Sequence, residues 1–199
     1  MIEKTLGHPP LEIVTRSGNE PFTSEGRPIG ARLLDFWRWS SSDLADNANR
    51  GVLAEYLVAL AVGAVTRARG SWDSYDLLIP SGIKIEVKSA SRWQTWYQKR
   101  PSQLTFGIGP THSWSAETGE FAPKARRQAD VYVFAVLESR KKPQLDPLNL
   151  DQWRFYVLPS GTLDERAPTQ KSIGLRGIIN FGARECRFEG LRGTIEASI

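Results

Sequence analysis

Three residues with complementary chemistry lie close together in the chain: Asp76, Glu86 and Lys88. Residues 83–88 read Ile-Lys-Ile-Glu-Val-Lys, an alternation of apolar and charged side chains that is typical of a half-buried β-strand. Glu86 and Lys88 would then point to the same side of that strand. Two carboxylates that face each other on neighbouring strands repel, and a divalent cation such as Mg²⁺ or Mn²⁺ reverses that repulsion. A plain surface ion pair between Glu86 and Lys88 is the simpler interpretation.

A fourth acidic residue, Glu55, lies upstream in a strongly apolar stretch. It is the only charged residue between Gly51 and Thr66. A buried carboxylate without a partner is costly, so Glu55 needs either a metal or a basic side chain. Two interpretations stay open. Glu55 joins Asp76 and Glu86 at one site, or it forms an ion pair with an arginine such as Arg50 or Arg69.

The local elements decide whether these side chains meet. Residues 75–79 and 83–88 flank Pro80-Ser81-Gly82, which predicts a β-hairpin. If Gly82 takes the left-handed conformation in a three-residue loop, Asp76 lies directly opposite Glu86. Glu55 would reach them from a helix over about residues 47–67, which we expect to be buried on every side because it is apolar all round.

Other elements follow from the hydrophobic pattern. Strands are predicted at residues 104–108, 131–137 and 153–158, and the second is apolar throughout, as in a central strand buried on both faces. A loop of about twenty residues precedes that strand. Residues 33–37 predict a short helix after an irregular arm, and the tail from Lys171 has a helical pattern. We therefore expect an N-terminal extension over residues 1–45 and one α/β domain over residues 46–199.

The order of a helix acid, an Asp and then Glu-x-Lys resembles the PD-(D/E)XK nuclease superfamily, which has the restriction-endonuclease-like fold. The resemblance covers about residues 49–90 and is carried by Gly51 to Glu55, Asp76 and Glu86-Val87-Lys88. Tyr75 stands where the superfamily name expects proline. The segments 35–37 and 130–134 are similar to bacterial members. The resemblance implies an αβββαβ core with a mixed central sheet flanked by helices.

The resemblance also implies an activity, which is Mg²⁺- or Mn²⁺-dependent hydrolysis of DNA phosphodiester bonds in restriction, repair, recombination or defence. It implies four catalytic residues: Glu55, Asp76, Glu86 and Lys88. Its candidate metal-binding residues are Asp76, Glu86, Glu55 and Val87. Lys88 would orient the attacking water or stabilise transition-state charge. A nuclease-like protein that binds nucleic acid without cutting is the main alternative, and an α/β interaction protein without nucleic acid is a third.

Positive charge gathers after the predicted hairpin. The whole chain has a net charge of +4, yet residues 91–142 hold nine Lys and Arg against four Asp and Glu, a local excess of +5. Such an excess is typical of a surface that binds nucleic acid. The candidate contacts are Arg92, Trp93, Lys99, Arg100, Gln103, Lys124, Arg126 and Arg127. Trp93, Trp96 and Tyr97 are equally compatible with the core side of a helix, and the cations with a solvated surface.

Composition excludes several classes of protein. A single cysteine, Cys186, excludes an internal disulfide and a cysteine-based zinc site, and it favours a reducing, cytoplasmic compartment. No apolar run approaches the roughly 20 residues of a membrane span. DNA is the expected partner, RNA stays open, and no membrane is expected. A homodimer would supply the two sites that cutting both strands requires.

Overall fold

A five-stranded mixed sheet forms the centre of the protein. The computed structural model describes residues 8, 11–66, 68–70, 73–115 and 118–199. The strand order is β3-β4-β6-β7-β9, with β3 at Leu77–Leu78, β4 at Lys84–Ser91, β6 at Val131–Leu137, β7 at Trp153–Pro159 and β9 at Arg184–Cys186. β4 and β6 are parallel, and the other neighbouring pairs are antiparallel. All seven residues of β6 are buried, which confirms the central strand expected from its apolar run.

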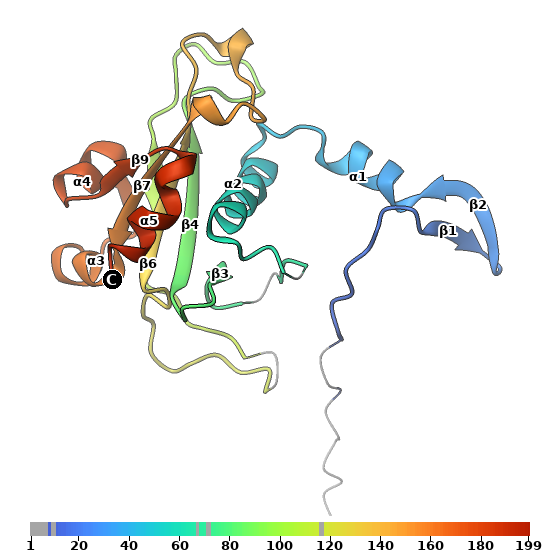
Figure 1. The fold of residues 1–199 in the computed structure, drawn as a ribbon, viewed down its shortest axis with the longest axis horizontal. Helices are drawn as coiled ribbons and strands as arrows, with labels where there is room; N and C mark the ends of the chain where they lie inside the picture. Colours follow the sequence, from blue (N-terminus) through green and yellow to red (C-terminus); the bar gives the residue numbers. More distant parts are fainter. Residues whose placement is uncertain (1–7, 9–10, 67, 71–72, 116–117) are drawn as a thin grey trace, which may run out of the picture.

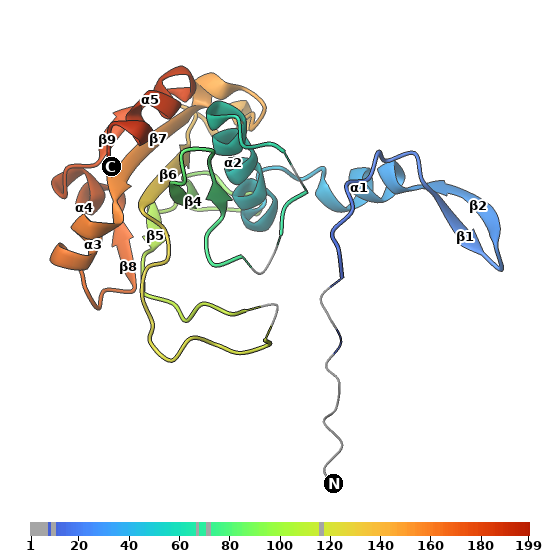
Figure 2. The same cartoon turned by 60° about the horizontal axis from the view of Figure 1, so that its bottom comes forward.

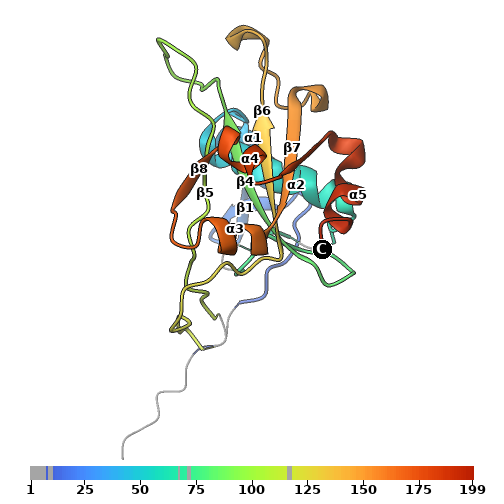
Figure 3. The same cartoon turned by 90° about the vertical axis from the view of Figure 1, so that its left-hand side faces the viewer.

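Helices cover both faces of this sheet. One face packs against α2 (Asn47–Val62) and α5 (Leu191–Glu196). The other packs against α3 (Ser160–Arg166), α4 (Leu175–Asn180) and a small sheet in which β5 (Thr105–Gly107) pairs with β8 (Ser172–Gly174). In Figure 1, α3 and α4 lie on one side of the sheet and α2 on the other; in Figure 3 the same helices lie in front of it and behind it. Short 3-10 turns lie at Lys142–Gln144, Leu150–Gln152 and Phe188–Gly190.

The predicted helix after residue 47 is confirmed as α2. Asp46 caps its first turn by accepting hydrogen bonds from the backbone N–H groups of Ala48 and Asn49. Gly63 ends it in the left-handed conformation, with φ at 73°. The expectation of burial on every side is wrong, because an outer stripe of three apolar residues remains about half exposed. These are Val52, Tyr56 and Leu60, which are 45%, 50% and 48% exposed.

The β3–β4 hairpin has the predicted register. Leu77 pairs with Ile85 and Leu78 with Lys84. Gly82 has a φ of 87°, and its N–H donates to the carbonyl of Ile79 at 2.9 Å, which closes the three-residue loop. Asp76 donates its N–H to the carbonyl of Ile85 at 3.0 Å, whereas a residue paired directly with Glu86 in this register would turn its N–H away from β4. Asp76 therefore lies next to β4 and close to Glu86, outside the regular pairing of the hairpin.

The N-terminal extension is more regular than expected. Pro21–Ser24 and Arg27–Arg32 form the hairpin β1–β2, and Leu33–Ser41 forms the predicted short helix, α1. Glu25 and Gly26 both have positive φ angles, which suits a two-residue hairpin loop. The expectation of an irregular arm is therefore wrong for residues 21–32, while residues 1–7, 9 and 10 lie outside the described part of the chain. In Figures 1 and 2 this extension projects away from the rest of the protein.

The C-terminal tail is more broken than the predicted helix. From Lys171 onward the chain forms β8, α4, β9 and α5 in turn. Edge pairing of β8 with β5 and of β9 with β7 takes these residues out of helical conformation. Gly182, with a φ of 93°, separates α4 from β9.

The expected α/β fold with a mixed central sheet is confirmed, although the order of elements departs from αβββαβ. β5 leaves the central sheet to pair with β8. Between β5 and β6, the described residues contain no helix and instead form a long excursion with two isolated bridges, Thr111 to Arg126 and Trp114 to Phe121 (Figure 2). Among the described residues, no helix combines the length and apolarity needed to cross a membrane.

Candidate active site

The structure brings Asp76, Glu86 and Lys88 together where β3 meets β4. An Oδ atom of Asp76 accepts a hydrogen bond from the Val87 N–H at 2.7 Å, which fixes this carboxyl group against β4. The Lys88 ammonium donates to the Glu86 carboxylate. The side chains of Lys88 and Glu86 are only 33% and 20% exposed. The predicted ion pair therefore exists, but it is too buried for the solvated surface pair that was the simpler interpretation.

Asp76 has the most perturbed carboxyl group of the site. Burial, followed by the charge of Glu86, raises its pKa from 3.8 to about 7. The Val87 N–H and Lys88 act in the opposite direction, and Glu55 raises the pKa further. Two carboxylates are thus close enough that both are ionised near neutral pH only at a cost, which is the electrostatic situation found at functional sites.

Glu55 has a basic partner from the segment that follows α2. Both of its carboxylate oxygens accept hydrogen bonds from Arg69, one of them at 3.0 Å. The carboxylate side chain is 14% exposed and Arg69 43%. Glu55 raises the pKa of Arg69, and Asp76 and Asp73 contribute in the same direction. The ion-pair interpretation of Glu55 is confirmed for Arg69, while a role at a shared site with Asp76 stays a prediction.

Arg50, the other arginine considered for Glu55, serves a structural purpose. It is 3% exposed and donates to Ser89 Oγ at 3.2 Å, the Ala45 carbonyl at 2.9 Å and Asn47 Oδ1 at 2.7 Å. These bonds fasten the beginning of α2 to β4 and to the residues before the helix. Arg50 therefore belongs to the scaffold of the site.

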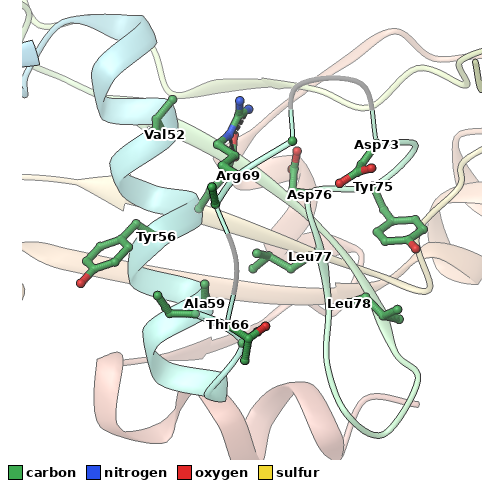
Figure 4. Close-up of a pocket in the computed structure, with 15 residues that line it drawn as sticks. Val52, Tyr56, Ala59, Thr66, Arg69, Asp73, Tyr75, Asp76, Leu77 and Leu78 are labelled. Atoms are coloured by element: carbon green, nitrogen blue, oxygen red, sulfur yellow. Dashed lines mark hydrogen bonds and ion pairs between the residues drawn. The ribbon is translucent and has the colours of Figure 1, made fainter. Parts of the chain in front are cut away.

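A cavity of about 400 Å³ lies between α2 and the segment that leads into β3. Figure 4 shows Arg69 and Asp76 pointing into the space beside α2, with Asp73 nearby. The wall is mostly apolar, and its charged residues are confined to one region. The lining consists of Val52, Glu55, Tyr56, Ala59, Ala64, Val65, Thr66, Ala68, Arg69, Gly70, Asp73, Tyr75, Asp76, Leu77 and Leu78. Two of the candidate catalytic acids thus border an open, ligand-sized space.

Asp76 and Glu86 are two acidic side chains, one fewer than a metal site made of three protein side chains would need. Across the parts of the chain that the structure describes, no three His, Cys, Asp or Glu side chains are arranged to hold a metal ion. The side chain of Val87 is buried and apolar, so this residue offers the site only its peptide group.

Sequence reasoning missed Tyr132, which borders the site from β6. Tyr132 is the parallel-strand partner of Glu86 and is 4% exposed. Burial, then the charge of Glu86, raises the pKa of its hydroxyl. Nothing in the sequence relates these two residues, because the pairing of β4 with β6 is set only by the tertiary fold.

The residues after β4 form an irregular loop with an exposed aromatic and basic surface. Trp96 and Tyr97 are 51% and 83% exposed, so the interpretation of these rings as core residues of a helix is wrong. Trp93 is half-buried, and its indole N–H donates to the Ser139 carbonyl at 3.1 Å. Arg92 pairs with Glu138 at 2.9 Å. The predicted nucleic-acid contacts Lys99, Arg100 and Gln103 line a hollow of about 430 Å³ together with the Trp96 ring. The full lining is Trp96, Gln98, Lys99, Arg100, Pro101, Ser102 and Gln103.

The remaining predicted contacts lie at the other end of the sheet, because they precede β6, which runs parallel to β4. Lys124 and Arg126 are exposed there. Arg127 departs from the prediction, since it is buried and donates to the carbonyls of Ile108 and Ala167, each at 2.8 Å, and to Asp164 at 2.6 Å. A cation held in this way cannot reach a phosphate, so Arg127 is a structural residue.

Comparison with protein families relates the chain to a nuclease family. The family model of bacteriophage T4 endonuclease IV matches residues 32–176, which run from the end of β2 to the beginning of α4 and include every candidate residue named above. No curated protein matches the chain.

Proposed function

Because the chain belongs to the bacteriophage T4 endonuclease IV family, and is therefore a nuclease, we propose that it hydrolyses DNA phosphodiester bonds with Mg²⁺ or Mn²⁺ at Asp76 and Glu86. The observation that carries this proposal is the pair of neighbouring carboxylates, in which the pKa of Asp76 is raised to about 7 by burial and by Glu86. A divalent cation bound between the two carboxylates would replace this repulsion by attraction.

The donor set suits a hard divalent cation. Carboxylate oxygens are the ligands that Mg²⁺ and Mn²⁺ prefer, and Mg²⁺ is commonly held by only one or two carboxylates, with water and substrate phosphate at the other positions. Asp76 and Glu86 would be those two ligands. The Val87 N–H, at 2.7 Å from Asp76, keeps one oxygen in place and leaves the other available. Glu55, neutralised by Arg69, would hold a water at the edge of the site.

The bound ion and Lys88 would have different roles in the hydrolysis. A bound ion would neutralise a non-bridging phosphate oxygen and lower the pKa of a water. Lys88, already within hydrogen-bonding distance of Glu86, lies where it can orient the attacking water or donate to the charge that develops on the phosphate. The arrangement of Asp76, Glu86 and Lys88 supports membership of the PD-(D/E)XK superfamily.

The surfaces on either side of the site would hold the DNA. Lys99 and Arg100 would bind backbone phosphates, and the exposed rings of Trp96 and Tyr97 would stack on bases. Lys124 and Arg126 would add phosphate contacts from the excursion before β6. That excursion approaches the site, since Ser74 and residues 113–115 line a common hollow.

A cleavage panel tests the proposal. Linear, nicked, branched and single-stranded DNA would be incubated with Mg²⁺, with Mn²⁺ or with EDTA. We expect metal-dependent cleavage that falls more than about 100-fold in Glu86→Gln, because this change removes a metal ligand and keeps the shape of the side chain. Glu185→Gln, on the exposed strand β9, is the matched control and should cut normally.

Two results would contradict the proposal. Cleavage by Glu86→Gln at the wild-type rate would exclude this residue from the chemistry. Binding of DNA without cleavage of any substrate by the wild-type protein would instead favour the alternative of a nuclease-like binding protein. Circular dichroism of each variant establishes that the fold is intact.

A further inference from the structure

Residues 18–41, here called the N-terminal arm, form a small folded unit. The hairpin β1–β2 joins α1 through two backbone hydrogen bonds of 2.9 Å, from Leu33 to the carbonyl of Glu20 and from Leu34 to the carbonyl of Gly18. The Asp35 carboxylate accepts from the Arg32 N–H at 2.9 Å, which caps α1. The arm is therefore ordered in advance of any partner.

The apolar side chains of this arm are uncovered. α1 is rich in aromatic residues, yet none of its residues is buried. Phe36 is 45% exposed, Trp37 37% and Trp39 84%, and the hairpin adds Phe22 at 41% and Ile29 at 62%. A soluble monomer seldom leaves a cluster of this size in contact with water, so the cluster indicates a docking surface.

The arm is held away from its own body. Between α1 and α2 the chain is pinned to the first turn of α2. Arg50 donates to the Ala45 carbonyl at 2.9 Å, and the Asn49 side chain donates to the Asp43 carbonyl at 3.0 Å. Since Arg50 is also bonded to β4 through Ser89, the residues from which the arm leaves the body are held in place. Figures 1 and 2 show the arm extending outward from this point.

The body carries a second uncovered apolar surface, the outer stripe of α2. Val52, Tyr56 and Leu60 are spaced four residues apart, so they lie on one side of the helix, and each is about half exposed. In Figure 4 the Tyr56 ring points away from Asp76, and the stripe begins at the wall of the cavity beside α2, which Val52 and Tyr56 also line.

We propose that the N-terminal arm of one copy packs on the α2 stripe of a second copy, and that the exchange is reciprocal in a two-fold symmetric dimer. Each copy would contribute both surfaces. The same contact between an arm and a stripe would then occur twice, as two-fold symmetry requires. The four arm aromatics Phe22, Phe36, Trp37 and Trp39 together expose the area of about two whole side chains, on the order of 400 Å². With the aliphatic neighbours and the stripe, each copy would bury on the order of 800 Å², the amount typical of a stable interface.

Charge distinguishes a protein partner from nucleic acid. Residues 18–41 contain three Arg and three Asp or Glu, so the arm carries no net charge, although the whole chain is at +4. A phosphate-binding arm would be basic.

The match to the endonuclease family begins at residue 32, so the hairpin lies outside the part that this family shares.

Light scattering and sedimentation velocity over a range of protein concentrations provide the first test. We expect the wild-type protein to have the mass of two chains, and Trp39→Ser and Leu60→Ser each to raise the dimer dissociation constant at least tenfold. Leu148→Ser is the matched control, because Leu148 is 70% exposed on the body and belongs to neither surface. Circular dichroism of the exposed-site variants should be unchanged.

Cross-linking identifies the contact. Trp39→Cys and Leu60→Cys would be made separately, each with Cys186→Ser, and mixed before treatment with a short bismaleimide. The cross-linked peptide should join residue 39 of one copy to residue 60 of the other. A wild-type protein that stays monomeric at all concentrations, or a dimer that tolerates both serine variants, would overturn the proposal. So would dimerisation that appears only with added duplex DNA. These measurements use neither metal nor substrate, so they are independent of nuclease activity.

Discussion

The raised pKa of the Asp76 carboxyl group makes the stability of the folded protein depend on pH. Burial, followed by the charge of Glu86, gives it a pKa of about 7, so in the metal-free folded protein it keeps a proton that the unfolded chain loses near pH 3.8. The folded state therefore binds more protons between these two pH values, and the free energy of unfolding falls as the pH rises through that window. Above about pH 7 this contribution no longer changes.

Asp76→Asn removes the titrating group while it keeps the acceptor for the Val87 N–H. In EDTA at pH 8 we expect this variant to be more stable than the wild-type protein by a few kcal/mol, since one pKa unit corresponds to about 1.4 kcal/mol. The decline in stability between pH 4 and 7 should flatten, and cleavage should be lost. Urea unfolding across pH 4 to 9 measures this, with the exposed Asp151→Asn as control. Identical pH profiles for Asp76→Asn and wild type would contradict the cause given for the shift.

At the scale of elements, the tight turn between β3 and β4 sets the register of the hairpin that brings Asp76 close to Glu86. A slip of one residue would send Glu86 to the opposite face, so the position of the site depends on Gly82 and its φ of 87°.

Gly82→Ala should lower the free energy of unfolding by about 1 kcal/mol, because a side chain in the left-handed region is strained even where space is open. A Cβ at Gly82 would meet nothing within 4 Å, so the cost is one of backbone conformation alone. Gly161→Ala in α3 also meets nothing within 4 Å and should be neutral or stabilising, which makes it the matched control. Thermal unfolding compares the two variants. A loss of stability in both would show that the turn conformation is not the cause.

The buried Arg127 joins the excursion before β6 to β5 and α3. Arg127→Met would remove the side-chain donor from the carbonyls of Ile108 and Ala167 and from Asp164, and we expect a loss of about 2–4 kcal/mol in the free energy of unfolding. Arg126→Met, one residue away and exposed, should change stability by less than about 0.5 kcal/mol and should weaken DNA binding instead. Urea unfolding and fluorescence anisotropy distinguish the two roles. Weaker DNA binding by a fully stable Arg127→Met would restore the original interpretation of this residue.

For the molecule as a whole, positive charge lies at both ends of the parallel pair β4 and β6, with the carboxylates between them. DNA that crosses the site could contact both ends. Binding of non-cleaving Glu86→Gln should therefore weaken steeply with salt, as counterions are released from each contacted phosphate.

Replacing both Lys99 and Arg100 with alanine should reduce the slope of log K against log salt by about 2, or somewhat less on single strands, since each removes one phosphate contact. Arg176→Ala, exposed on α4 outside this surface, should leave the slope unchanged. Anisotropy titrations from low to moderate salt provide the measurement. An unchanged slope in the double variant would mean that this hollow does not contact phosphate.

The sequence by itself determined what depends on near neighbours. The alternation at residues 83–88 and the turn at Gly82 predicted the hairpin and its register, and with them that Asp76 and Glu86 lie close together. The apolar runs located α2, β6 and β7, because a segment that is mostly buried is apolar over a length that is visible along the chain.

Only the tertiary structure decided what depends on distant partners. It chose Arg69 over Arg50 as the partner of Glu55, buried Arg127, placed Tyr132 beside Glu86 and divided the basic window between two ends of the sheet. It also left the outer stripe of α2 and the aromatic residues of α1 uncovered, although both segments are apolar enough to suggest burial. These outcomes follow from packing between segments far apart in the chain, where no local period or spacing carries the information.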